Sequence, residues 1–201
     1  MARRRRRRRR WLALAILVFA LVLAARLALG RLYPLAYHAE ISRCAAEHGL
    51  DPYLVVALIR AESRFRPAAT SPQGARGLMQ IMPETGRWVA EQMGLPFSPD
   101  SLYEPAYNIR VGCWYLAALL QEFAGDPVLA LAAYNGGLGN VKDWLEQERW
   151  TGERHTLTQV PFAETRHYVA AVLRDQQRYR FLYGEWRWKA EGGDGHAEPG
   201  T

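Results

Sequence analysis

The chain has 201 residues, enough for one domain with a sizeable core and little more. Its formal charge of +6 comes from the first 30 residues, which hold nine arginines and no acid. The remaining residues hold 17 Lys and Arg against 20 Asp and Glu, a net charge of −3. A nucleic-acid-binding domain would carry a basic face of its own, so we expect no nucleic-acid partner.

Eight consecutive arginines lead directly into an apolar segment over residues 11–30. A helix of this length spans the ~30 Å hydrocarbon core of a membrane at ~1.5 Å per residue. Because basic flanks stay inside the cell, we predict a cytoplasmic leader (1–10), a single-pass anchor in the cell membrane (11–30) and an extracytoplasmic domain. A cleaved signal peptide is the alternative, but no clean A-x-A site precedes a polar start, so a retained anchor is favoured.

Residues 31–188 read as helices joined by short glycine and proline turns, with almost no strand-like alternation, so the predicted fold class is all-α. The last residues, 189–201, are polar and rich in glycine, and we predict a disordered tail there. In chain order, we expect helices over about 35–48, 52–62, 83–92, 107–123, 128–134, 140–148 and 162–179.

Two cysteines, Cys44 and Cys113, lie 69 residues apart and lack the spacing of a zinc site. Outside the cell they could form one disulfide. A sequence does not give their separation in space, so two separate buried thiols are the favoured interpretation.

Glu62 is the first candidate for chemistry. Asp51 and Pro52 form a strong helix start, with Asp as N-cap and Pro at the first helical position. The apolar positions that follow share one face with Glu62, which therefore lies at the end of the helix near its apolar stripe. These positions are Leu54, Val55, Leu58 and Ile59.

A glutamate in such a place is usually a boundary residue or half of an ion pair. Here, however, an irregular glycine and proline segment returns to apolar Leu78, Met79 and Ile81. These side chains could desolvate the Glu62 carboxyl and raise its pKa, which would keep it protonated as a general acid must be.

Two further segments carry polar side chains in suggestive places. Tyr134 and Asn135 directly precede a glycine cluster, which is either a simple helix end or backbone that lets a ligand approach these side chains. Glu164 and Tyr168 are four residues apart and share a helix face, which is ordinarily a solvated face.

Together these segments resemble the sequence blocks of the lytic transglycosylases of the soluble-lytic-transglycosylase (SLT) type, a lysozyme-like family. The four blocks occur in the family's order and cover about residues 40–182. Gly137 and Leu138 stand where the family often has Ala and then Pro or Ser, but these are loop positions. The matching segments are Glu62–Thr85, Asn108–Leu116, Ala130–Val141 and Glu164–Val169.

The resemblance implies a lysozyme-like catalytic domain over residues 31–188 that cleaves the β-1,4 bond between N-acetylmuramic acid and N-acetylglucosamine in peptidoglycan. Glu62 matches the family's single catalytic glutamate, which acts first as acid and then as base while a 1,6-anhydro end forms. We expect a monomer without a metal or cofactor. By the same resemblance, the expected substrate-binding residues are Ser71, Met79, Gln80, Tyr134, Asn135, Glu164 and Tyr168.

Two alternatives remain open. A hydrolase similar to goose-type lysozyme would use water and a second carboxylate, for which Glu164 is the nearest candidate. A non-catalytic peptidoglycan-binding module is disfavoured, because a binder has no need of a lone acid in an apolar pocket.

Overall fold

The structure, a computed structural model, describes the backbone of residues 2–184 and the side chains of residues 11–184. The chain forms two compact units, one ending at Ala36 and the other starting at Tyr37. The predicted tail over 189–201 and the last four residues of the predicted domain, 185–188, lie outside the described residues.

The first unit is the single helix α1 (Ala2–Leu32), which includes the arginine run as well as the apolar segment. Within it, Trp11–Leu32 is long and apolar enough to cross a membrane, and all of these residues are exposed. Exposed apolar surface of this extent is unfavourable in water. The helix therefore agrees with an anchor, and a signal sequence near the N-terminus would pass the same test of length and apolar composition.

The second unit is helical, and among its described residues there is no strand, only isolated bridges that pair Thr70 with Arg76 and Arg76 with Ile81. The predicted all-α class is confirmed. The helices are α2 (His38–His48), α3 (Pro52–Ser63), α4 (Pro83–Gln92), α5 (Pro105–Glu122), α6 (Pro127–Gly136), α7 (Leu138–Glu146) and α8 (Ala163–Tyr183). Two 3₁₀ turns, η1 (Pro99–Tyr103) and η2 (Arg154–Gln159), were not predicted, because such short turns lack an apolar period.

Helix starts follow the local sequence closely. The Asp51 carboxylate accepts a hydrogen bond from the Tyr53 amide at 3.0 Å, and Asp126 accepts one from Val128 at 2.7 Å. Four α-helices begin on a proline, whose missing N–H costs nothing at the first helical position. The predicted starts at Pro52 and Pro83 are confirmed, and the helix expected from about residue 128 begins at Pro127.

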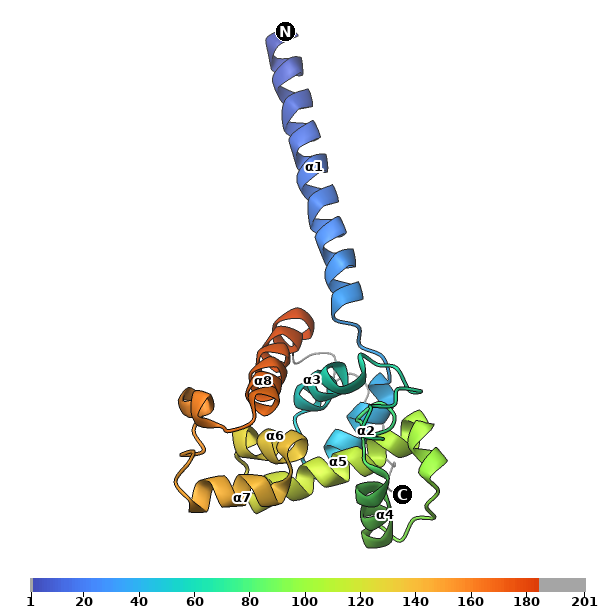
Figure 1. Ribbon diagram of the computed structural model, residues 1–201. Helices are drawn as coiled ribbons and strands as arrows, with labels where there is room; N and C mark the ends of the chain where they lie inside the picture. Colours follow the sequence, from blue (N-terminus) through green and yellow to red (C-terminus); the bar gives the residue numbers. More distant parts are fainter. Residues whose placement is uncertain (1, 185–201) are drawn as a thin grey trace, which may run out of the picture. The chain divides into compact units, whose positions relative to one another are not determined.

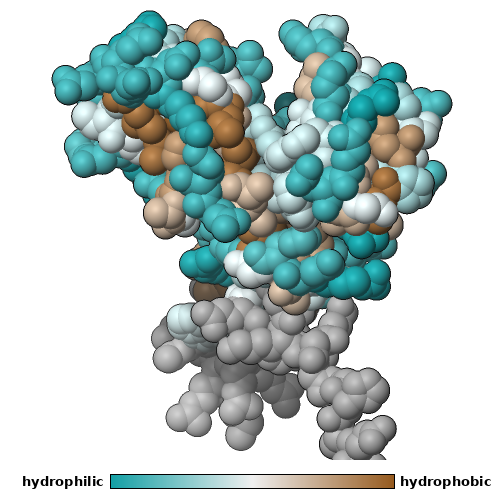
Figure 2. Space-filling model, turned by 90° about the horizontal axis from the view of Figure 1, so that it is seen from below, coloured by the Kyte–Doolittle hydropathy of each residue, from teal (hydrophilic) through white to brown (hydrophobic). Residues whose placement is uncertain are grey.

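Helix α3 runs through the core of the domain. It packs against α8, while α2 and α6 each pack against α5 (Figure 1). Every residue from Tyr53 to Ile59 is buried, so this stretch has no solvent face, whereas the sequence analysis expected a single apolar stripe. On the face shown in Figure 2, the surface is hollowed between two lobes.

Cys44 of α2 and Cys113 of α5 form a disulfide, with their Cα atoms 6.4 Å apart. The favoured interpretation from the sequence, two separate thiols, is therefore wrong. The two residues meet because α2 packs along α5, which no local sequence pattern reports. The bond closes a long loop and so restricts the unfolded chain.

Candidate active site

Glu62 lies in the last turn of α3, where this central helix leaves the core. The next residue, Ser63, is buried, and its hydroxyl donates a hydrogen bond to the Ile59 carbonyl at 3.2 Å. Arg64 then ends the helix with a left-handed backbone, at φ 52°. The Glu62 side chain is therefore carried by a rigid element and is half-buried.

Burial raises the pKa of Glu62 from about 4.5 to about 7, because the carboxylate form loses its hydration. The neighbouring Tyr168 hydroxyl favours the carboxylate and lowers the pKa, and the negative charge of Glu164 raises it. The Tyr168 hydroxyl is buried and lies beside Glu62, and it changes the pKa of Glu62 less than burial does but more than the charge of Glu164 does. Near neutral pH, Glu62 is poised to give or take a proton.

The opposite wall of the site is the irregular segment 64–82, which folds back on itself. Arg76 and Ile81 exchange two backbone hydrogen bonds, at 2.9 and 3.0 Å. The Ser71 hydroxyl accepts a hydrogen bond from the Ala75 amide at 3.1 Å and closes a tight turn. The segment thus holds its shape without being a helix or a strand.

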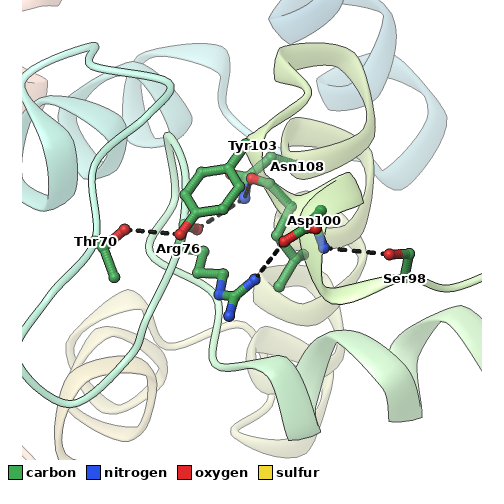
Figure 3. A network of polar contacts seen from close by, with 7 residues as sticks. Thr70, Arg76, Ser98, Asp100, Tyr103 and Asn108 are labelled. Atoms are coloured by element: carbon green, nitrogen blue, oxygen red, sulfur yellow. Dashed lines mark hydrogen bonds and ion pairs between the residues drawn. The ribbon is translucent and has the colours of Figure 1, made fainter.

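Asn108, on α5, fastens this segment to the rest of the domain (Figure 3). Its amide group donates to the carbonyls of Arg76 at 2.9 Å and Leu102 at 2.8 Å, and its oxygen accepts from the Met79 amide at 2.7 Å. The side chain is 0% exposed. Gly77 allows this close approach, because a Cβ atom there would lie 2.0 Å from the Leu102 carbonyl oxygen.

Two contacts nearer the surface reinforce the same connection. The hydroxyls of Thr70 and Tyr103 share a hydrogen bond of 2.8 Å, and Arg76 pairs with Asp100 at 2.9 Å (Figure 3). The η1 turn, which carries Asp100 and Tyr103, therefore braces the segment from outside.

Met79 connects the segment 64–82 to α6. Its carbonyl accepts a hydrogen bond from the Tyr134 hydroxyl at 2.8 Å. Its side chain is 0% exposed and packs against Gly112, where a Cβ atom would lie 2.4 Å from the Met79 sulfur. The contact of Met79 with substrate stays a prediction, and what the structure shows is a side chain packed in the core and a carbonyl that holds Tyr134 at the site.

The cleft beside Glu62 has a volume of about 370 Å³ and is built from α3, the segment 64–82, α6 and the start of α8. It brings together six of the predicted site residues: Glu62, Ser71, Gln80, Tyr134, Asn135 and Glu164. Tyr168, predicted with them, lies beside Glu62 and lines a neighbouring groove. Residues that the sequence analysis did not single out complete the lining: Gln73, Ala75, Met82, Gly136, Phe162 and Thr165.

Two amide side chains in the cleft are held in defined orientations. The Gln80 nitrogen donates to the carbonyls of Ala69 at 3.1 Å and Gly77 at 2.8 Å, so the Gln80 oxygen is left as an acceptor. The Asn135 oxygen accepts from the buried Thr165 hydroxyl at 2.8 Å, so the Asn135 nitrogen is left as a donor. Thr165 was missed because its role appears only when α8 meets α6.

The arrangement is chemically suited to general-acid catalysis on a helical domain, because a half-buried carboxyl with a raised pKa faces a cleft that has oriented hydrogen-bonding groups. Within residues 11–184, no group of three or more His, Cys, Asp or Glu side chains is placed to hold a metal ion. Residues 40–157 match the transglycosylase SLT domain family, and the chain belongs to this family.

Known relatives agree with this assignment. The chain is 35% identical to the soluble lytic murein transglycosylase of Escherichia coli K12 over 156 residues, which cover 76% of this chain and 24% of the relative. It is 32% identical to the membrane-bound lytic murein transglycosylase C of Haemophilus ducreyi, over 69% of this chain and 44% of the relative. The chain thus spans about a quarter of the length of the soluble relative.

Solved structures show the same fold. The crystal structure of the 70 kDa soluble lytic transglycosylase from Escherichia coli matches 76% of this chain and 25% of its own, with a TM-score of 0.72 and 35% identity. Lytic transglycosylase Slt from Pseudomonas aeruginosa, solved as an inactive glutamate-to-glutamine mutant, matches 74% of this chain and 24% of its own, with a TM-score of 0.68 and 38% identity. The predicted lysozyme-like SLT fold is therefore confirmed.

Proposed function

We propose that this protein is a membrane-anchored lytic transglycosylase. It cleaves the bond between N-acetylmuramic acid and N-acetylglucosamine in peptidoglycan and leaves a 1,6-anhydro end on the muramic acid. The observation that carries the proposal is the half-buried Glu62 carboxyl, whose burial raises its pKa, at a cleft of about 370 Å³ that is lined by the oriented amides of Gln80 and Asn135. Family membership and the lytic murein transglycosylases among the relatives support it.

In the first step, protonated Glu62 donates its proton to the glycosidic oxygen while the bond from that oxygen to the anomeric carbon breaks. Positive charge develops on the muramic acid ring. The acetamido group of the same sugar stabilises this charge, so the protein need not supply a second carboxylate there.

In the second step, the Glu62 carboxylate takes the proton of the sugar's own 6-hydroxyl, and that oxygen bonds to the anomeric carbon. Glu62 returns to its protonated form and no water is consumed. The internal hydroxyl is favoured over solvent because it is held next to the reacting carbon. A pKa near neutral suits a group that must act as acid and then as base.

The oriented amides fit the acetamido groups of the substrate. An acetamido group carries one N–H donor and one carbonyl acceptor, which match the Gln80 oxygen and the Asn135 nitrogen. Tyr134 and Ser71 line the same cleft with hydroxyl groups that are already ordered by backbone partners. We propose these four residues as sugar contacts and Tyr168 as a residue that positions the Glu62 carboxyl.

Product analysis tests this function. Purified full-length protein in detergent is incubated with peptidoglycan, and the soluble fragments are measured by mass spectrometry. We expect most new ends to be lighter by one water than ordinary reducing ends. A majority of reducing ends would instead assign the chain as a hydrolase, with Glu164 as the second carboxylate in the cleft. If no cleavage is detected, the remaining assignment is a non-catalytic peptidoglycan-binding module.

The pH dependence of cleavage follows from the same carboxyl. The acid step needs protonated Glu62, so kcat/KM should fall about tenfold for each pH unit above about 7. The cleavage rate of soluble glycan strands, measured between pH 5 and 9, gives this alkaline part of the pH profile. A profile that stays flat to pH 9 would contradict the assignment of Glu62 as the acid.

A further inference from the structure

The Cys44–Cys113 disulfide is attached to the helix that holds one wall of the cleft. Cys113 follows Gly112 on α5, and the Met79 side chain packs against the backbone of Gly112, where a Cβ atom would lie 2.4 Å from the Met79 sulfur. Asn108, earlier on the same helix, accepts a hydrogen bond from the Met79 amide at 2.7 Å. The part of α5 from Asn108 to Cys113 therefore sets the position of the segment 64–82.

The same helix also contacts the α6 side of the cleft. The Tyr115 ring on α5 lies 5.3 Å from the Tyr134 ring, measured between centroids. The Tyr134 hydroxyl donates to the Met79 carbonyl at 2.8 Å, and the negative charge of nearby Glu62 raises the pKa of Tyr134. A displacement of α5 would therefore move groups on both sides of the Glu62 carboxyl.

Helix α5 is itself tied to α2. The two helices pack together and are joined by the Cys44–Cys113 bond. The Cys44 Sγ atom also lies 3.6 Å from the Ile109 carbonyl oxygen, directly after Asn108 in the chain. Packed helices can slide past one another by small amounts, and a covalent bond at this place prevents such sliding.

Of the two sulfur atoms, the one on Cys44 is the more accessible. Cys44 is 5% exposed and Cys113 is 0% exposed. A pocket of about 350 Å³ between α2 and α5 opens onto Cys44, and Cys113 is not part of its lining. The polar side chains of this pocket, which suit a hydrated thiol or disulfide reagent, are Glu40, Arg43, Glu47, Tyr107 and Arg110.

We propose that the Cys44–Cys113 bond is a redox switch for the catalytic cleft, formed and broken through Cys44 at this pocket by a dithiol–disulfide exchange partner. The inference rests on the proposed function, because cleavage at the cleft is the activity that the bond controls. When the bond is intact, α5 holds the wall in place. When it is reduced, the wall loses this covalent support.

The exchange takes place in two steps. The Cys44 thiolate attacks the disulfide of the partner, a mixed disulfide forms, and one partner sulfur leaves as a thiolate. The Cys113 thiolate then attacks the Cys44 sulfur, which closes the protein disulfide and releases the second partner thiolate. The two protons lost by the cysteines end on the two partner thiols. Because thiols stay reduced in the cytoplasm and disulfides persist outside it, the cleft becomes fully active only after export.

The first test follows cleavage as the bond is reduced. Full-length protein in detergent is equilibrated in mixtures of oxidised and reduced dithiothreitol, its thiols are alkylated and counted by mass spectrometry, and cleavage of soluble glycan strands is measured. We expect kcat/KM to follow the oxidised fraction and to be at least ~10-fold lower in the fully reduced protein, because small displacements of catalytic groups have effects of this size. The Cys44→Ala/Cys113→Ala variant should cleave at the low rate in every mixture.

The pH profile separates a displaced wall from partial unfolding. A looser wall lets water reach the Glu62 carboxyl, so its pKa should fall and the alkaline loss of rate should move to lower pH in the reduced protein. Partial unfolding would lower the rate without moving the profile. The assays use a temperature at which tryptophan fluorescence shows both forms to be folded. An unchanged rate, an unchanged pH profile, or the lack of any such temperature would overturn the proposal.

The second test identifies the sulfur that exchanges. Cys113→Ala leaves Cys44 as a free thiol, and Cys44→Ala leaves Cys113. Each folded variant is treated with oxidised glutathione, and the mixed disulfide is followed by intact mass. We expect Cys44 to react at least ~10-fold faster than Cys113, because exchange requires access to the sulfur. Equal rates, or a faster reaction of Cys113, would overturn the assignment of Cys44.

The proposed function can fail separately from this inference. If the oxidised protein does not cut glycan, the transglycosylase function fails. The switch is then judged by co-sedimentation of the oxidised and reduced Glu62→Gln protein with peptidoglycan, which measures binding without cleavage. We expect the reduced form to bind about 5-fold more weakly, because the support of Gln80 and Tyr134 is lost. Equal binding of the two forms would refute the switch.

Discussion

Replacing Glu62 by glutamine is expected to slow glycan cleavage at least ~10²-fold, the usual value of a general acid. Glutamine has the size of the protonated side chain but cannot transfer a proton to the glycosidic oxygen. Because the shape of the cleft is kept, affinity for glycan strands should change little. Rates are measured by release of soluble fragments, and affinity by co-sedimentation with peptidoglycan.

Loss of folding cannot account for such a result, and the sign of the pKa shift shows why. Folding raises the pKa of Glu62 from about 4.5 to about 7, so the folded state favours the protonated form. The stability linked to this proton is complete below about pH 4.5 and is lost as the pH rises through about 7. Glutamine does not titrate, so the Glu62→Gln variant does not lose this stability as the pH rises. Its melting temperature at pH 8 should therefore equal or exceed that of the wild type.

A matched control is Glu91→Gln, which makes the same chemical change at an exposed position of α4. It should cleave glycan at the wild-type rate. If Glu62→Gln also cut at that rate, Glu62 could not be the acid, and another carboxyl in the cleft, Glu164, would have to take its place.

Asn108→Ala is expected to lower the free energy of unfolding by about 3–5 kcal/mol, since each buried polar group left without a partner costs about 1–3 kcal/mol. The substitution leaves two buried backbone groups without their partner, the carbonyl of Leu102 and the amide of Met79, and it removes one of the two hydrogen bonds of the Arg76 carbonyl, which keeps the one from the Ile81 amide. This is a large share of the ~5–15 kcal/mol that ordinarily stabilises a domain. Chemical denaturation followed by tryptophan fluorescence measures the change.

Asn140→Ala provides the comparison, because Asn140 is exposed and makes one hydrogen bond, to the Gly136 carbonyl at 2.7 Å. Its cost should stay below about 1 kcal/mol. At temperatures where Asn108→Ala is still folded, its cleavage should also be slower, because Met79 and Gln80 lose the support that orients them. A cost for Asn108→Ala no larger than that for Asn140→Ala would show that Asn108 does not brace the segment.

The helices could be predicted well from the sequence because their signals are local. A proline after an N-cap aspartate and a glycine at a helix end act on neighbouring backbone groups, and such signals set the starts at Pro52 and Pro127. The 3₁₀ turns were missed because they carry no such signal. The sequence also underestimated the burial of α3, since an apolar stripe does not reveal how many neighbours surround a helix.

For the candidate site too, the sequence identified some features and missed others. Glu62, Gln80, Tyr134 and Glu164 were identified because residues of these types stand in blocks that resemble a known family, and the structure places them around one cleft. Met79 belongs to the same block, but its side chain turned out to be buried. Which way a loop side chain points depends on packing against α5, and sequence spacing does not contain that information.

By itself, the sequence determined that the chain carries an apolar N-terminal helix, that the domain after it is all-α over the residues the structure describes, and which glutamate is the candidate acid. These follow from composition, periodicity and motifs, which are properties of neighbouring residues. Only the tertiary structure decided the pKa of Glu62, the bond between Cys44 and Cys113, and which residues line the cleft beside Glu62. Each depends on desolvation or distance between residues far apart in the chain, and only packing sets those quantities.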